Sequence, residues 1–91
     1  MKTVQFEATI QITIDGARCL VNQIFACPDG SEEFQKNKFH IMALLHKGIL
    51  INTSGQYDRY SLRLSDWGEQ YFWKVRNYMQ EWFPELVENK Y

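Results

Sequence analysis

Residues 3–15 read TVQFEATIQITID, and apolar and polar side chains alternate along them without a break. Unbroken alternation is typical of a β-strand with one buried face and one face in water. The strand meets Asp15-Gly16, a pair that favours a two-residue hairpin turn because both positions tolerate positive φ. We therefore expect a long hairpin over residues 3–27, with Gly16 in its turn.

The next segment, residues 31–47, carries apolar side chains at helical spacing. Ser31 or Asp29 can cap a helix here, and acidic residues follow where the helix dipole favours negative charge. Phe39 lies off the apolar stripe. Gly48 suits the left-handed position that follows a helix C-terminus. We therefore expect a helix that ends at Gly48.

Residues 49–64 predict a second hairpin, for which two loop lengths are open. A two-residue loop at Ser54-Gly55 would place Ile51 opposite Asp58. A four-residue loop, residues 54–57, places Ile51 opposite Tyr60. We favour the longer loop because it pairs apolar side chains on one face.

Residues 67–82 predict a second helix with a broad aromatic stripe. Asp66 and Glu69 stand three residues apart, as in a capping box with Asp in the cap position. Trp73 falls outside the stripe. Pro84 stops the helix and suits the first position of a short terminal turn.

The predicted element order is ββαββα, which places the chain in the α+β class. Its 91 residues suffice for one domain, residues 1–91, and not for two separate cores. The simplest two-layer solution is a four-stranded antiparallel sheet with both helices packed on one face. We take this architecture as the fold predicted from the sequence.

Composition narrows the classes of function. Ten Lys and Arg stand against eleven Asp and Glu, and this balance argues against a strongly basic nucleic-acid binder. No apolar run approaches the roughly 18 residues that a membrane span needs. The first residues lack the apolar core of a signal peptide. We expect a cytoplasmic protein with no membrane association.

The sequence contains no catalytic or cofactor-binding motif that we recognise. On a shared strand, the Cα atoms of Cys19 and Cys27 would lie about 26 Å apart, beyond the roughly 7 Å that a disulfide allows. We expect both thiols to be buried and inert. His40 and His46 lie on different sides of their helix and do not match a zinc site. The sequence thus predicts no enzyme activity, no metal and no cofactor.

The last predicted helix has more aromatic side chains than a core stripe needs. Its apolar arc spans roughly 140°, against roughly 100° for a typical core-facing stripe. Trp and Tyr are favoured anchors at protein interfaces. We predict a binding module that acts through protein contacts, with self-association as a homodimer among them. The candidate partner surface consists of Trp73, Trp67, Tyr78, Phe39, Leu20 and Ile24. A small-molecule site between sheet and helices is a further alternative, with no ligand specified.

Two further stretches form a recognisable pattern, LLHKGILI at residues 44–51 and YSLRLSDWG at residues 60–68. Through them, residues 39–72 resemble the wing region of winged-helix DNA-binding domains. In that family a recognition helix ends in a Leu-rich turn, Gly and an aliphatic pair. A two-stranded wing follows, and Tyr-x-Leu-Thr-x-x-Gly opens the next helix. Ser65 takes the Thr place here, and Gly68 matches.

The resemblance implies an alternative function, a DNA-binding transcriptional regulator. Residues 33–47 would then enter the major groove, and the wing would touch phosphate. The implied DNA contacts are Gln35, Lys36, Asn37 and Lys38 on the helix and Arg59 or Arg63 on the wing. The predicted hairpin over residues 3–27 departs from the family, in which two helices precede the recognition helix.

Overall fold

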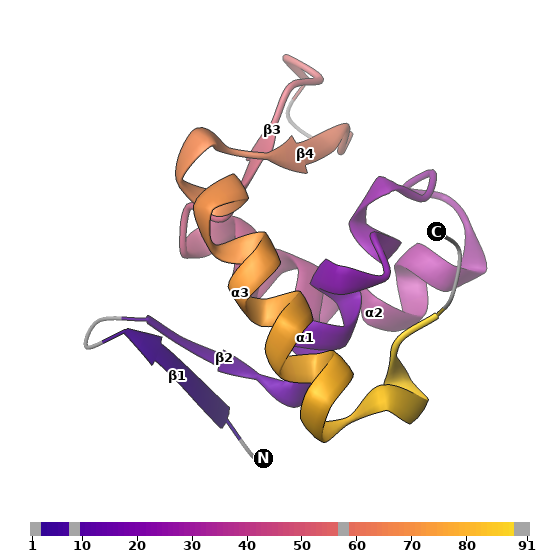
Figure 1. The fold of residues 1–91 in the computed structure, drawn as a ribbon. Helices are drawn as coiled ribbons and strands as arrows, with labels where there is room; N and C mark the ends of the chain where they lie inside the picture. The colour runs from indigo at the N-terminus through magenta and orange to yellow at the C-terminus, as the bar shows by residue number, and fades with distance from the viewer. Residues whose placement is uncertain (1–2, 8–9, 57–58, 89–91) are drawn as a thin grey trace.

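The computed structural model describes residues 3–7, 10–56 and 59–88. The order of elements is β1 (Thr3–Glu7), β2 (Ile10–Thr13), α1 (Ile14–Val21), η1 (Ile24–Ala26), α2 (Glu32–His46), β3 (Leu50–Asn52), β4 (Leu62–Leu64), α3 (Asp66–Trp82) and η2 (Pro84–Leu86), where η denotes a short 3₁₀ helix (Figure 1). In the described part of the chain, the strands form two separate antiparallel pairs, β1 with β2 and β3 with β4. The α+β class holds, but the predicted four-stranded sheet with two helices on one face is wrong.

The return strand predicted for the first hairpin is instead helix α1. The Thr13 hydroxyl oxygen accepts a hydrogen bond from the backbone N–H of Gly16 at 2.9 Å and so caps this helix. Ala17, Leu20 and Val21, three and four residues apart, all face the core. The Asp15-Gly16 pair therefore lies in the first turn of α1, and not in a hairpin turn.

The first hairpin is correspondingly short. β1 pairs with β2 from Thr3 opposite Thr13 to Glu7 opposite Ile10, with an irregularity between Gln5 and Glu7. Residues 8–9, between the two strands, lie outside the described residues. The period-two pattern thus belongs to two short strands and not to one long one.

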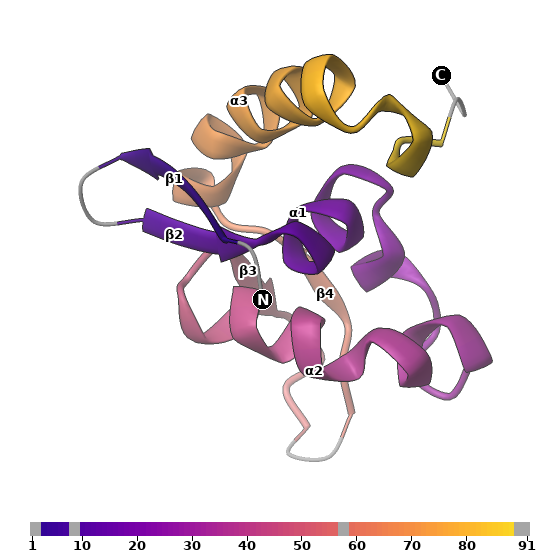
Figure 2. The same cartoon turned by 90° about the horizontal axis from the view of Figure 1, so that it is seen from below.

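The three α-helices are arranged around a shared core. Figure 2 shows α1 between α2 on one side and α3 on the other. The largest fully buried side chains come from all along the chain: Phe34, Ile12, Leu20, Ile41, Leu44, Ile49, Leu50, Met79, Val75 and Cys19. This burial is the main stabilising contribution, because each such side chain gains roughly 1.5–3 kcal/mol on leaving water. The core therefore fixes the relative positions of all three helices.

The second hairpin exists as predicted, but its register differs. Leu50 pairs with Leu64 and Asn52 with Leu62, so Ile51 lies opposite Arg63 and not opposite Tyr60. Hydrogen bonds of the Asn52 side chain stabilise this register, in which the connection between the strands is longer than predicted. Its Nδ2 donates to the backbone oxygen of Arg59 at 2.9 Å, and its Oδ1 accepts from the backbone N–H of Ser61 at 3.1 Å.

The junction between this hairpin and α3 depends on two glycines. Gly48 has a φ of +78°, which confirms its predicted left-handed position after α2. Ser65, and not Asp66, caps α3 by accepting from the backbone N–H of Gly68 at 2.9 Å. A Cβ at Gly68 would lie 2.0 Å from the backbone oxygen of Ile49. Only glycine allows α3 to begin so close to the strand.

Candidate functional site

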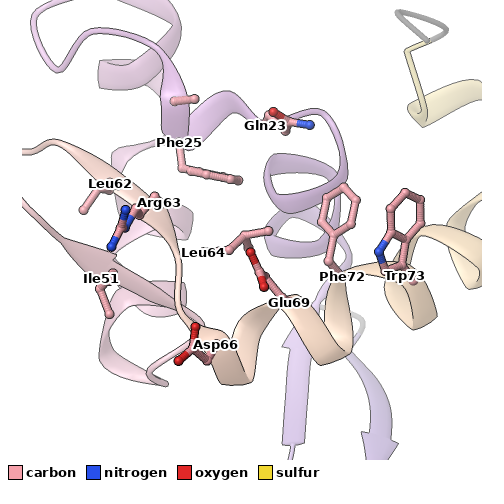
Figure 3. Close-up of a pocket in the computed structure, with 11 residues that line it drawn as sticks. Gln23, Phe25, Ile51, Leu62, Arg63, Leu64, Asp66, Glu69, Phe72 and Trp73 are labelled. Atoms are coloured by element: carbon pink, nitrogen blue, oxygen red, sulfur yellow. The ribbon is translucent and has the colours of Figure 1, made fainter.

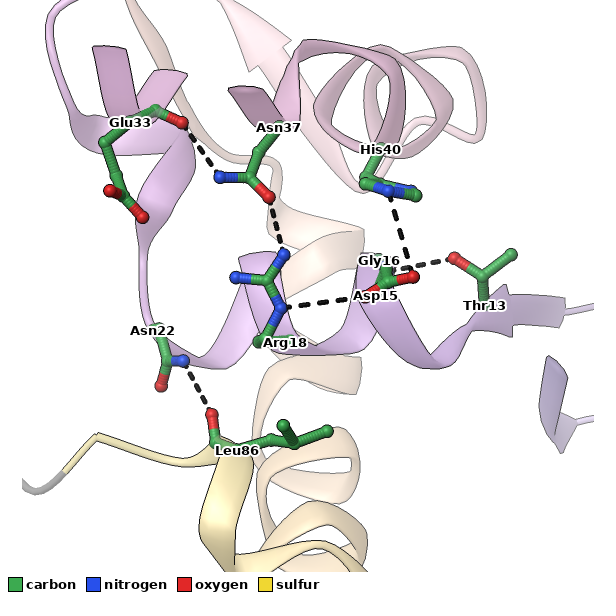
Figure 4. A network of polar contacts seen from close by, with 9 residues as sticks. All are labelled: Thr13, Asp15, Gly16, Arg18, Asn22, Glu33, Asn37, His40 and Leu86. Atoms are coloured by element: carbon green, nitrogen blue, oxygen red, sulfur yellow. Dashed lines mark hydrogen bonds and ion pairs between the residues drawn. The ribbon is translucent and has the colours of Figure 1, made fainter. Parts of the chain in front are cut away.

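Polar contacts fix α2 against α1 (Figure 4). Arg18 Nη2 donates to Asn37 Oδ1 at 2.5 Å, and Asn37 Nδ2 donates to the backbone oxygen of Glu33 at 2.8 Å. One turn further along α2, His40 Nε2 lies 3.9 Å from Asp15 Oδ2. Asn37 is only 6% exposed. It faces α1, and this corrects its predicted place among the residues that face a DNA groove.

The second hairpin is fixed beside the first half of α2. The backbone N–H of Tyr60 donates to Asp29 Oδ2 at 3.0 Å. The Tyr60 ring stacks on Phe34 with a centroid separation of 6.1 Å. Lys38 Nζ lies 5.7 Å from the centroid of the same ring. These contacts hold the segment before β4 next to α2.

After the acidic first turn of α2, which contains Glu32 and Glu33, the residues that face away from the core are polar or cationic, with one aromatic ring among them. We call the five exposed residues Gln35, Lys36, Lys38, Phe39 and Arg59 the α2–hairpin face. Lys36 Nζ forms an ion pair with Glu32 at 3.3 Å, and the Gln35 side chain donates to the backbone oxygen of Asp29 at 2.5 Å. The predicted helix residues other than Asn37 are thus accessible together with Arg59.

Arg63 lies elsewhere. It borders a groove of about 750 Å³ between η1, the second hairpin and α3 (Figure 3). Apolar side chains and the carboxylates of Asp66 and Glu69 share this groove with it, and Trp73 stands at its edge. The two arginines predicted for the wing therefore lie on different surfaces, since Arg59 does not line the groove.

Charge is distributed unevenly between these two sides of the molecule. The α2–hairpin face holds three cations, Lys36, Lys38 and Arg59, although the chain as a whole carries −1. The acidic first turn of α2, with Glu32 and Glu33, lies beside it. Residues 63–88, which border the groove and form α3, contain three Lys or Arg and five Asp or Glu, a net charge of −2. Figure 2 shows α2 on the side opposite α3. The total charge of the chain conceals this grouping of cations.

The six residues of the predicted partner surface do not form one patch. Leu20 and Ile24, 0% and 4% exposed, are buried in the core, which corrects their predicted place on an outer face. Trp73 is 58% exposed, and Phe39 lies on α2, on the far side of α1. Trp67 stands six residues before Trp73, so the two point about 120° apart around α3. Trp67 packs edge-on against Tyr71, and Tyr78 is half-buried beside Trp82 and Phe83.

The two cysteines lie in different environments. Burial raises the pKa of the Cys19 thiol to about 11, so at neutral pH it is protonated and a poor nucleophile. Cys27 is half-exposed, and not buried as predicted. Within the described ranges, no three His, Cys, Asp or Glu side chains are grouped to hold a metal ion.

None of the helices in the described residues is both long and apolar enough to span a membrane. No protein-family model, curated protein or solved structure matches the chain. The case for a function therefore rests on the charge, exposure and contacts described above.

Proposed function

We propose that this protein binds duplex DNA through the α2–hairpin face. The observation that carries the proposal is the grouping of three exposed cations, Lys36, Lys38 and Arg59, on this face, in a chain whose total charge is −1. Phosphate neutralisation by Lys and Arg supplies the sequence-independent part of DNA affinity. A locally cationic face provides that attraction even when the whole molecule is slightly acidic.

The order of elements supports the proposal. α1 precedes α2 and packs against it. The sequence had predicted a strand at this position, and that strand was the departure from the winged-helix pattern. The hairpin of β3 and β4 follows α2 directly and is fixed beside it by Tyr60. A major groove about 12 Å wide admits one α-helix, while an adjacent hairpin reaches the backbone.

The residues of the face have different roles in this proposal. Gln35 and Lys36 face outward from the first half of α2, and on DNA binding they exchange their bonds to Asp29 and Glu32 for bonds to base edges. Lys38, beside the Tyr60 ring, and Arg59, on the hairpin connection, neutralise phosphates. Asn37 positions the helix through Arg18 and makes no DNA contact.

The salt dependence of binding tests this function. We would titrate a fluorescent 30-base-pair duplex of mixed sequence with the protein and follow anisotropy between 50 and 200 mM salt. With three phosphates neutralised, the association constant falls about fortyfold over this range. Absence of binding at 50 mM salt, or affinity that does not change with salt, contradicts the proposal.

A second candidate function is self-association through α3. Trp73 is 58% exposed at the edge of the groove, and tryptophan is a common interface anchor. Glu69 and Arg76 flank it, four residues before and three after. A twofold axis across antiparallel α3 helices would set Glu69 of one copy opposite Arg76 of the other. Light scattering over a concentration series tests this: a dimer that Trp73→Ser converts to a monomer supports it, and a strict monomer contradicts it.

A further inference from the structure

Phe39 is the most exposed large hydrophobic residue in the described part of the chain, at 73%. It lies in the middle of α2, on the side opposite the buried Phe34, Ile41 and Leu44. Its ring meets His40 edge-on, with centroids 5.6 Å apart, and leaves most of its surface in water. A ring so placed contributes little to the core of this protein.

The neighbours of Phe39 show which kind of partner suits it. On a helix surface, residues three and four positions away are adjacent. Those before Phe39 are Gln35 and Lys36, both exposed, and those after it are Met42 and Ala43, both partly buried. A helix that docks in a protein groove presents several exposed apolar anchors at this spacing. Phe39 is the one large apolar side chain of α2 that is exposed, which does not fit that mode.

The major groove of DNA favours mostly polar side chains. Polar side chains meet the base edges there, and the C5-methyl group of thymine is the one apolar feature that a base pair presents. A helix with one apolar side chain among amide and ammonium groups matches such a surface. Lys36, Lys38 and Arg59 provide the attraction to the surrounding phosphates.

We infer that Phe39 contacts thymine methyl groups in the major groove and thereby gives this protein a preference for A·T base pairs. The inference rests on the proposed DNA-binding function and adds the chemical group that the face recognises. It assigns a role to a ring that the core does not use. Gln35, one turn earlier on the same side, pairs with adenine once its amide leaves the backbone oxygen of Asp29.

Two duplexes that differ only in the methyl group test this inference. Alternating poly(dA-dT) and poly(dA-dU) present the same hydrogen-bonding groups, and only the first carries the thymine methyl. We expect the full-length protein to bind poly(dA-dT) about fourfold more tightly, the fold-change that corresponds to burying one methyl-sized group. Phe39→Ala should remove this preference and keep the salt dependence.

Trp73→Ala is the matched control, since it removes an exposed ring from α3 and should keep the preference. Each outcome decides a different point. Equal binding of the natural protein to both duplexes overturns the role of Phe39 and leaves the DNA-binding function standing. A preference that survives in Phe39→Ala also overturns it, because the two duplexes then differ for another reason. Failure to bind either duplex at 50 mM salt overturns the proposed function and this inference with it.

Discussion

The two sides of this small protein differ in charge and in the kind of side chain that they expose. The α2–hairpin face presents three cations around a single aromatic ring, next to the acidic first turn of α2. The α3 side presents Trp73, a groove with two carboxylates, and a segment of net charge −2. A total charge of −1 conceals both. The total charge of a chain therefore does not argue against nucleic-acid binding until the charge of each surface has been counted.

The contact that joins the two sides should be the most sensitive to change. Gly68→Ala would place a Cβ 2.0 Å from the backbone oxygen of Ile49, so the start of α3 must move away from β3. We expect a loss of about 3 kcal/mol or more in the free energy of unfolding. Gly30→Ala is the control, because a Cβ there meets nothing within 4 Å. The same urea midpoint for both variants would contradict this prediction, because it would show that the backbone around Gly68 and Ile49 can rearrange without loss of stability.

Neighbouring positions on α2 should separate stability from binding. Asn37→Ala removes the acceptor of the Arg18 guanidinium, and we expect a loss of about 1–2 kcal/mol in stability. Lys36→Ala changes an exposed side chain, and we expect stability within about 0.5 kcal/mol of the natural protein but weaker DNA binding. Urea denaturation and anisotropy measure the two effects. Equal stability of both variants would contradict the inward position of Asn37.

The burial of Cys19 on α1, between the two sides, should make the stability of the protein depend on pH. Burial raises its pKa in the folded protein to about 11, from 9.0 for a free thiol. Between these pH values the folded state holds more protons than the unfolded state. The contribution of Cys19 is therefore complete below pH 9 and is lost as the pH rises to 11, by at most about 1.4 kcal/mol per pH unit. Thermal unfolding curves of Cys19→Ala should lack this decline, and an identical pH dependence in both proteins argues against the burial of Cys19.

The smallest effect on stability should come from the most prominent ring of the α3 side. Trp73→Ala removes a side chain that is 58% exposed, so we expect a change within about 0.5 kcal/mol in the free energy of unfolding. The same variant should bind DNA as the natural protein does. A loss above about 1 kcal/mol would mean that Trp73 packs into the fold and is not a free surface residue.

Local signals in the sequence correctly predicted α2 and α3. Ser31 caps α2, and Gly48 follows it in the left-handed conformation, as expected from residue type alone. The exposure of Phe39 and Trp73 also followed from helical spacing. These features depend on neighbours within a few residues, which a sequence displays directly.

The errors arose where one sequence pattern suits two structures. Ala17, Cys19 and Val21 alternate as a strand would, yet Ala17, Leu20 and Val21 also form a helical stripe. The Thr13 cap, together with burial against α2 and α3, decides for the helix. The strand interpretation is what placed Leu20 on an outer face. The register of the second hairpin depended on side-chain bonds of Asn52, which residue pairing rules do not include.

The most direct test of the central claim compares two charge reversals of equal size. Lys36→Glu with Lys38→Glu changes the α2–hairpin face, and Lys74→Glu with Arg76→Glu changes α3. Each pair shifts the net charge from −1 to −5, so any effect of total charge is the same in both. We expect the first pair to weaken duplex binding at 50 mM salt at least about tenfold more than the second. Equal weakening by both pairs would contradict a DNA-binding face on α2 and the hairpin.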